Sequence, residues 1–211
     1  MKQKDVFTYL SEGQEKEEGI KVEVTRGQAL RRLEQKTLGC RRCGLREGCS
    51  QVVFGEGSPD ALLMLVGEGP GADEDRLGRP FVGRAGQLLD KILEAAGFQR
   101  EEVYIGNVVK CRPPKNRIPL PEEINACYPH LQEQIHIIRP KIIVCLGAMS
   151  AKTLVDPRAQ ITKIRGKWVE KQEIRIMPTF HPAALLRDPQ KKKLVWQDFQ
   201  QVEREYKELA L

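Results

Sequence analysis

Four cysteines have the residue type and spacing of a metal site. Cys40 and Cys43 form a Cys-x-x-Cys pair, and Cys111 and Cys127 follow far downstream. Such a pair presents two thiolates from one tight turn, and a second pair from elsewhere in the fold completes a tetrathiolate site for zinc or an iron-sulfur cluster. The spacing leaves one alternative open, in which Cys111 and Cys127 are ordinary buried thiols.

A glycine-rich segment is the second candidate for chemistry. The sequence GEGPG (67–71) allows backbone amides to approach a ligand, and ADED (72–75) adds several carboxylates. The segment matches neither the P-loop nor the dinucleotide fingerprint, which disfavours nucleotide binding. In the following GRPFVG (78–83), Phe81 stands between rigid and flexible residues and could be a stacking platform.

Strands and helices alternate along the chain. Continuous apolar or β-branched runs predict four strands, and polar motifs follow the carboxyl end of each. Helical spacing predicts helices between them, including one from Gly27 that stops at Gly39, just before Cys40. We therefore expect a three-layer α/β/α sandwich with a central, mainly parallel, four-stranded sheet and a ligand crevice beyond the strand ends. The expected strands are 61–66, 103–109, 141–147 and 173–180, and the other helices are 86–96, one from about 121, and 189–209.

Length, composition and charge limit the remaining possibilities. The 211 residues suit one domain, which we place at 28–211, preceded by a mobile extension over the polar residues 1–27. We find no secretory signal and no apolar run long enough to span a membrane, so we expect a cytoplasmic protein in which cysteines bind metal or stay reduced. A net charge of +6 fits a protein that meets polyanions.

Four motifs in a fixed order resemble the iron-sulfur uracil-DNA glycosylases, known as family four. They are GEGPGADED (67–75), GRPFVGRAGQLL (78–89), NVVKCRPPKNRIP (107–119) and FHPAALLR (180–187), and the resemblance spans about residues 38–206. It implies the uracil-DNA glycosylase fold over 28–211. It also implies a 4Fe-4S cluster on Cys40, Cys43, Cys111 and Cys127, with zinc as the alternative occupant. The expected partner is uracil-containing DNA, single- or double-stranded, bound by a monomer that starts base excision repair.

Three residues of these motifs suit the tasks of such an enzyme. Phe81 would stack on the flipped base, an interaction of about 1–3 kcal/mol per base. Asn107 would donate to uracil O4 and accept from N3–H, which rejects cytosine because its donors and acceptors are reversed. His181 would donate to uracil O2, where negative charge accumulates as the base departs. The alternatives are core packing for Phe81, turn capping for Asn107 and, for His181, a structural or exposed histidine without a chemical role.

The remaining roles concern water and the vacated base stack. The best-known uracil-DNA glycosylases carry an acidic residue where this chain has Gly69, so the water-activating group must lie elsewhere. Glu68 is expected to shape the pocket and orient water, with Glu74 assisting, because a carboxylate can stabilise an oxocarbenium-like sugar. Leu185 resembles the apolar wedge that enters the gap left by the base, and its alternative role is packing.

Basic residues flank the proposed loops and would contact phosphates without reading sequence. The main rival interpretation is a non-catalytic DNA-binding module in which a cysteine-bound metal holds distant chain segments together. A branch that becomes covalently linked to DNA is disfavoured because CRPPKNRIPLP (111–121) lacks its histidine-bearing insertion. A glycosylase for deaminated purines is disfavoured by Asn107, whose amide suits a pyrimidine. The basic residues are Lys110, Arg112, Lys115, Arg117, Arg187, Lys191, Lys192 and Lys193.

Overall fold

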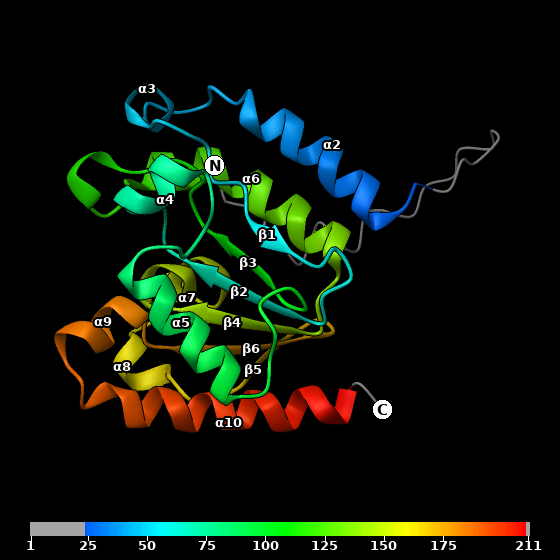
Figure 1. The fold of residues 1–211 in the computed structure, drawn as a ribbon, viewed down its shortest axis with the longest axis vertical. Coiled ribbons are helices and arrows are strands. Elements are labelled where there is room, and N and C mark those ends of the chain that lie inside the picture. The colour runs from blue at the N-terminus through cyan, green and yellow to red at the C-terminus, as the bar shows by residue number, and fades with distance from the viewer. Residues whose placement is uncertain (1–23, 210–211) are drawn as a thin grey trace.

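The computed structural model describes residues 24–209, which form a sheet with helices on both faces (Figure 1). The strand order is β1-β3-β2-β4-β6-β5. The four central strands run parallel, and the short strands at the two edges pair antiparallel to their neighbours. The strands are β1 (Glu56–Gly57), β2 (Leu63–Gly67), β3 (Tyr104–Asn107), β4 (Ile142–Leu146), β5 (Val169–Lys171) and β6 (Ile174–Thr179).

The four predicted strands are confirmed as the parallel centre of the sheet, and the sheet has six strands instead of four. Successive residues of β2 alternate between two cores: Met64 and Val66 face one, and Leu63 and Leu65 face the other. All four are fully buried because helices cover both faces, which explains the continuous apolar run. The edge strands β1 and β5 contain two and three residues, too few to produce a periodic pattern.

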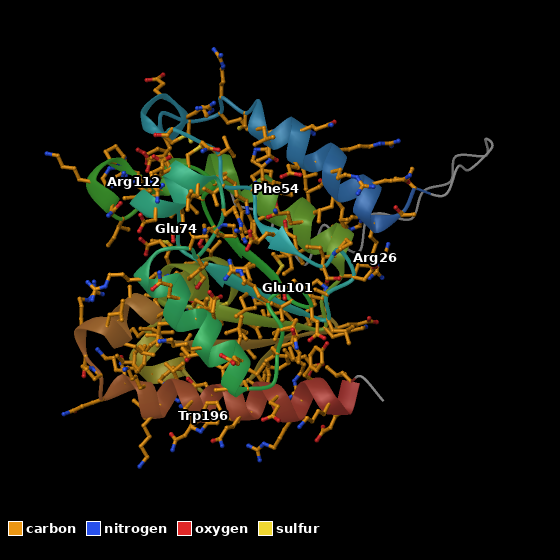
Figure 2. The ribbon with its side chains drawn as sticks, in the orientation of Figure 1. Arg26, Phe54, Glu74, Glu101, Arg112 and Trp196 are labelled. Atoms are coloured by element: carbon orange, nitrogen blue, oxygen red, sulfur yellow. The ribbon has the colours of Figure 1, made fainter. Side chains whose placement is uncertain are left out.

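The two helical layers enclose separate cores (Figures 1 and 2). On one face, α2 (Arg26–Leu38) packs along α6 (Pro121–Ile138), and α7 (Ala148–Leu154) joins them. On the other face, α5 (Arg84–Ala95) and α10 (Lys191–Leu209) cover the sheet. The three-layer α/β/α arrangement is therefore confirmed. The side chains that join helices to sheet include Leu33, Leu131 and Ile135 on the first face and Leu89, Leu93 and Phe199 on the second.

Local signals fix the beginnings of two helices that position the cysteines. Thr25 and Gln28 form a reciprocal capping box, so α2 begins at Arg26. Residues 25–27 thus belong to the helix start and not to the predicted extension, of which residues 1–23 lie outside the described part of the chain. Pro121 occupies the first turn of α6, and Glu123 accepts from the N–H of Leu120 at 2.7 Å.

The loops after the parallel strands meet at one edge of the sheet because parallel strands share the direction of their carboxyl ends. Gly67 at the end of β2 lies opposite Asn107 at the end of β3, and Leu146 of β4 lies opposite Thr179 of β6. The sequence did not predict α7 or several shorter helices. The shorter ones that come after parallel strands are α4 (Ala72–Leu77), the 3-10 turn η1 (Pro114–Asn116), α8 (Ile161–Ile164) and α9 (Pro182–Arg187), and α3 (Leu45–Gly48) precedes the first strand.

Candidate active site and cysteine site

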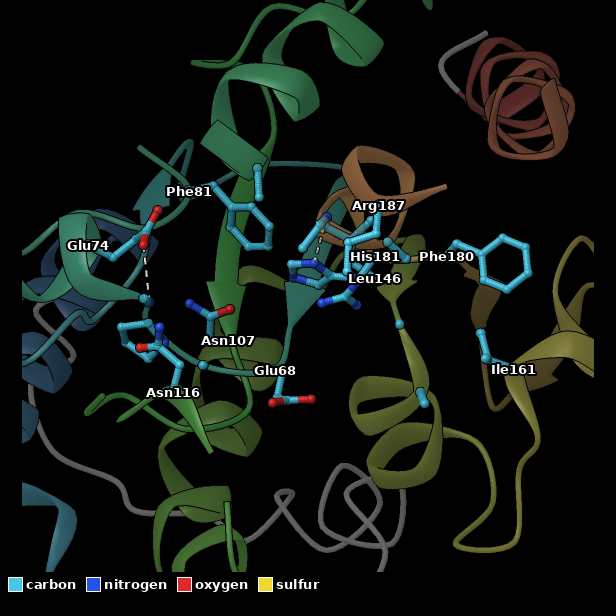
Figure 3. A pocket seen from close by; sticks show the side chains of 18 of the residues that line it. Glu68, Glu74, Phe81, Asn107, Asn116, Leu146, Ile161, Phe180, His181 and Arg187 are labelled. Atoms are coloured by element: carbon cyan, nitrogen blue, oxygen red, sulfur yellow. Dashed lines mark hydrogen bonds between the residues drawn. The ribbon is translucent and has the colours of Figure 1, made fainter. Parts of the chain in front are cut away.

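A cavity of about 620 Å³ opens where the loops after β2, β3, β4 and β6 meet. Figure 3 shows Phe81, Asn107 and His181 arranged around one space within it. The structure thus brings together, from three separate loops, the residues that the sequence assigned to base binding. The cavity lining also includes Glu68, Gly69, Glu74, Asn116, Leu146, Gly147, Phe180, Arg187 and Lys191.

Phe81 forms one wall of the cavity and is held in a backbone conformation that side chains rarely adopt. Its φ is 51°, and only 5% of its surface is exposed. A Cβ at Gly86 would lie 1.9 Å from the Phe81 carbonyl oxygen, so only glycine lets α5 begin so close to this turn. Arg100 donates to the carbonyl of Pro80 at 2.6 Å and fixes the chain just before the ring. The ring centroid lies 5.5 Å from that of His181.

Glu74 lies at the cavity edge, but its carboxylate binds the protein's own backbone. Oε1 accepts from the N–H groups of Val82 and Gly83 at 2.9 and 2.8 Å, and Oε2 accepts from that of Gly71 at 3.1 Å. These charge-assisted bonds join the glycine-rich loop to the loop that carries Phe81. Glu74 therefore holds the loop that carries Phe81, and its carboxylate is used for these backbone contacts.

Asn107 ends β3 and presents a buried amide to the cavity. The residue is 2% exposed, and its Oδ1 has no hydrogen-bond partner among the described residues. A Cβ at Gly67 would lie 2.5 Å from this Oδ1 and 2.6 Å from Phe81 Cζ, so a glycine there keeps the space between them open. Because an unpaired buried acceptor costs roughly 1–3 kcal/mol, an acceptor in this position is suited to a ligand N–H.

His181 is the N-cap of α9, and its ring is oriented by the backbone. Nδ1 accepts from the N–H of Ala183 at 3.1 Å, so the proton of the neutral ring resides on Nε2. Burial, together with the charge of Arg187, lowers the pKa of His181 to about 4. The ring is therefore neutral near pH 7 and offers one N–H donor.

Glu68 and Gly69 lie on the loop directly after β2. The Glu68 side chain is half-buried, and burial raises its pKa above the ordinary value. The main-chain carbonyl of Glu68 accepts from the N–H of Val109 at 3.1 Å, which extends the β2 and β3 pairing past Asn107. A Cβ at Gly69 would lie 2.7 Å from Val109 Cγ2, so the loop packs closely against that residue.

The four predicted cysteine ligands line one small cavity. Cys40 and Cys43 follow α2, Cys111 follows β3, and Cys127 lies on α6. The N–H of Lys110 points at Cys127 Sγ over 3.2 Å, a contact typical of backbone amides around metal thiolates. Among residues 24–209, no group of three His, Cys, Asp or Glu side chains is arranged to hold a single metal ion.

The sequence of the chain also matches known protein families. The family model described as the uracil-DNA glycosylase superfamily matches residues 54–200. A type-4 uracil-DNA glycosylase from Sulfurisphaera tokodaii is 45% identical over 87% of this chain and 86% of that protein. A second type-4 uracil-DNA glycosylase, from Thermotoga maritima, is 48% identical over 78% of this chain and 86% of that protein. The chain belongs to the type-4 uracil-DNA glycosylase family.

The likeness to a neighbouring family is weaker. A type-5 uracil-DNA glycosylase from Pyrobaculum aerophilum is 32% identical over 61% of this chain and 64% of that protein.

Among the helices of the type-4 chain that the structure describes, none combines the length and apolar character needed to cross a bilayer.

The structure separates the basic residues of this type-4 chain into three groups. Lys110 is 1% exposed and cannot reach a phosphate, so this part of the sequence prediction is wrong. Arg117 is committed to Glu123 through bonds of 2.6 and 2.8 Å. The remaining residues stay accessible at the surface, where Arg112 lies on the loop after β3 (Figure 2). Arg187 and Lys191 line the active-site cavity itself.

Leu185 lies in the hydrophobic core of the type-4 chain and not at the cavity. It is 1% exposed and belongs to the core beneath α5 and α10, whereas its neighbour Leu186 is 40% exposed. Other residues of α9, namely Ala183, Ala184 and Arg187, line the cavity. The exposed large apolar side chain of α9 is therefore Leu186.

Sequence reasoning missed Asn116, which lines the cavity from the loop after β3. Asn116 has a φ of 55° and accepts from Arg112 Nε at 2.8 Å through its Oδ1. Asparagine tolerates this left-handed conformation. The only sequence signal for a turn here is the Pro-Pro-Lys segment that precedes Asn116. Gly147, with a φ of 102°, was assigned to a strand end but also lines the cavity.

Proposed function

We propose that the chain is a monofunctional uracil-DNA glycosylase that releases uracil from single- or double-stranded DNA and leaves an abasic site for base excision repair. It would act as a monomer in the cytoplasm. The observation that carries the proposal is the buried, unpartnered Oδ1 of Asn107 in a cavity shared with Phe81 and His181. The type-4 names of its relatives support the same reaction.

Base recognition follows from the donors and acceptors that the cavity provides. Uracil stacked on Phe81 would place its N3–H at Asn107 Oδ1 and its O4 at the Asn107 amide N–H. Cytosine carries an unprotonated N3 and an amino group at these positions. An acceptor would then face the Asn107 oxygen, and a donor would face the Asn107 amide N–H. The uracil edge satisfies the buried amide, and the cytosine edge leaves it unpaired at a cost of several kcal/mol.

Cleavage breaks the bond between C1′ of the deoxyribose and N1 of the base. The departing base keeps the bonding electrons, and the neutral His181 donates its Nε2–H to O2, where the charge accumulates. The sugar acquires oxocarbenium character, and water adds to C1′. The proton that this water loses passes through solvent to the departing uracil anion, which is released as neutral uracil. Glu68 is the carboxylate that we assign to orient that water, because Glu74 is held by three backbone N–H groups.

The cysteine site fits a 4Fe-4S cluster on Cys40, Cys43, Cys111 and Cys127, with zinc as the alternative. All four cysteines line one cavity, and the Lys110 amide supplies a hydrogen bond to Cys127. When bound, the cluster would cross-link the segment after α2, the segment after β3 and α6, which is a structural role. Iron and acid-labile sulfide analysis of the purified protein distinguishes the two occupants.

The rival function is a DNA-binding module without catalysis. A labelled oligonucleotide with one deoxyuridine distinguishes the two, because alkali cleaves the strand only where the base has been removed. We expect cleavage at uracil and none at cytosine or thymine in matched strands. Retention of the oligonucleotide by iron-loaded protein without any alkali-sensitive site would favour the rival.

Replacing His181 with alanine should lower the rate of uracil excision by about 100-fold, since a well-placed donor to a developing oxyanion contributes about 3 kcal/mol. With a pKa near 4, the ring stays neutral, so the His181 contribution should not change between pH 5 and 8. Single-turnover rates of wild type and His181→Ala across this range measure both effects. An inflection near pH 6.5 that disappears in the variant would show that the ring titrates normally and contradict the neutral-donor role.

We assign the wedge role to Leu186 instead of Leu185. Leu186→Ala should slow excision from duplex DNA by about tenfold and leave single-stranded DNA nearly unaffected, because only the duplex has a stack to fill. Leu185→Ala is the matched control, and it should lower stability by about 2–5 kcal/mol through a core cavity without selecting between the substrates. Equal losses on both substrates for Leu186→Ala would contradict the assignment.

A further inference from the structure

A buried polar network lies directly behind the base-recognition residue. The ammonium of Lys110 donates to the main-chain carbonyl of Asn107 at 2.9 Å and to Gln134 Oε1 at 2.5 Å. Gln134 Nε2 donates in turn to the carbonyl of Phe54 and to Tyr104 Oη, each at 2.9 Å. Lys110 and Tyr104 are 1% exposed and Gln134 is fully buried, so water does not substitute for any of these bonds.

The orientation of the Gln134 amide is determined by its partners. Both hydrogens of Nε2 are used by two acceptors, so Oε1 must face a donor, and Lys110 supplies it. An ammonium offers three donors and no acceptor, which matches a site built from a main-chain carbonyl and an amide oxygen. The network therefore requires a lysine-like donor at this position.

The main chain of Lys110 extends the same network to the cysteine site. Its N–H points at Cys127 Sγ over 3.2 Å, and its carbonyl accepts from the N–H of Val53 at 2.8 Å. Lys110 also directly precedes Cys111 in the chain. One residue thus contacts a cysteine of the proposed cluster through its backbone and the recognition residue through its side chain.

The side chain of Asn107 is buried but makes no hydrogen bond among the described residues. Its Oδ1 has no partner among the described residues, so the position of the amide depends on the backbone at Asn107. The β2 and β3 pairing holds one side of this backbone, with Gly67 opposite Asn107 and the Val108 N–H bound to the Gly67 carbonyl at 3.0 Å. The bond from Lys110 to the Asn107 carbonyl holds the other side.

We propose that Lys110 is a positioning residue that connects the cysteine site to base recognition by fixing the Asn107 backbone through its buried ammonium and Gln134. The inference rests on the proposed function, since it concerns how that site binds uracil. It assigns to this basic residue a role inside the fold, although its place in a basic run suggests contact with DNA. Lys110 does not line the cavity around Phe81 and His181, so it would act on base binding through Asn107.

The test compares binding of free uracil with binding of abasic DNA at a temperature where every variant is folded. Lys110→Met keeps the length of the side chain but removes its donors. We expect inhibition by free uracil to weaken by at least about tenfold, the effect of losing about 1.4 kcal/mol of recognition, with unchanged affinity for an abasic duplex. Iron content per chain is measured in parallel, because Lys110 neighbours Cys111.

Gln134 provides a second pair of variants that lies away from the cysteines in sequence. Gln134→Leu removes the acceptor for Lys110 and should weaken uracil inhibition in the same direction as Lys110→Met. Gln134→Glu keeps an oxygen that faces the ammonium but cannot donate to the Phe54 carbonyl, so it should recover only part of the loss. Ile176→Ala is the control for general destabilisation, because Ile176 is buried in the same core on β6 and its apolar side chain forms no hydrogen bond with these groups.

Uracil inhibition equal to wild type in iron-loaded Lys110→Met would overturn the inference. A parallel loss of uracil and abasic-DNA binding, as in Ile176→Ala at matched stability, would also overturn it. If Lys110→Met fails to load iron, Gln134→Leu decides, and wild-type inhibition in that variant overturns the inference. Failure of the proposed function is distinct, because wild-type protein would then release no uracil from DNA.

Discussion

Replacing Asn107 with alanine is expected to lower uracil excision by about a thousandfold, the largest loss for any single side chain of the cavity. A site built to hydrogen-bond its substrate loses several kcal/mol when those bonds disappear, because the base must then leave water without compensation. The side chain is 2% exposed and its Oδ1 has no partner among the described residues, so alanine removes no structural bond of that oxygen. The melting temperature should therefore change little, although the rate of uracil excision falls by this factor.

Asn116→Ala is the matched control for this prediction. Asn116 lines the same cavity and has the same side chain, but it is exposed, and its Oδ1 is already bonded to Arg112. Single-turnover excision from a uracil-containing strand should fall less than about tenfold in this variant. Equal losses at Asn107 and Asn116, or a near-normal rate in Asn107→Ala, would contradict the assignment of base recognition to Asn107.

Removing one ligand of the cysteine site should have the largest effect on stability. Cys43→Ala is expected to abolish iron binding and to lower the melting temperature by about 10 °C or more, because the proposed cluster would join three segments and its binding energy would be folding energy. The segments are the loop after α2, the loop after β3 and α6. Iron content, visible absorption and thermal unfolding measure the outcome.

Cys145→Ala serves as the control because Cys145 is fully buried in β4, within the core and outside the cysteine cavity. It should keep its iron and lose about 1 kcal/mol of stability from the small cavity. Cys49→Ala is informative too, since the Cys49 thiol lies close enough to interact with Cys111. Retention of full iron in Cys43→Ala, or its loss in Cys145→Ala, would contradict the assignment of the four ligands.

The parallel centre of the sheet could be predicted because its strands are buried on both faces. Leu63 to Val66 contact helices on one side or the other, so each residue must be apolar and the run is visible in sequence. The edge strands were not predictable, since Glu56–Gly57 contributes only two residues and takes its conformation from pairing with β3. The same holds for α9, whose six residues are too few for a periodic signal.

The candidate site was predictable in its residue types but not in every orientation. Asn107 ends β3, His181 follows β6, and Phe81 lies in the segment between β2 and α5; parallel topology brings such segments together. Leu185 and Leu186 are chemically identical neighbours, so only the docking of α9 shows which one is buried. Lys110 belongs to a basic run in the sequence, and its burial becomes visible only when α6 brings Gln134 to it from 24 residues away.

The most direct test of the central claim is to recover the products of one reaction. Iron-loaded protein is incubated with a duplex that contains a single deoxyuridine, and free uracil and abasic sites are counted while the strand is examined without alkali. Release of one uracil per abasic site from an intact strand, with no base released from cytosine or thymine controls, is the predicted result. Stable binding of the duplex without release of uracil would contradict the proposed reaction.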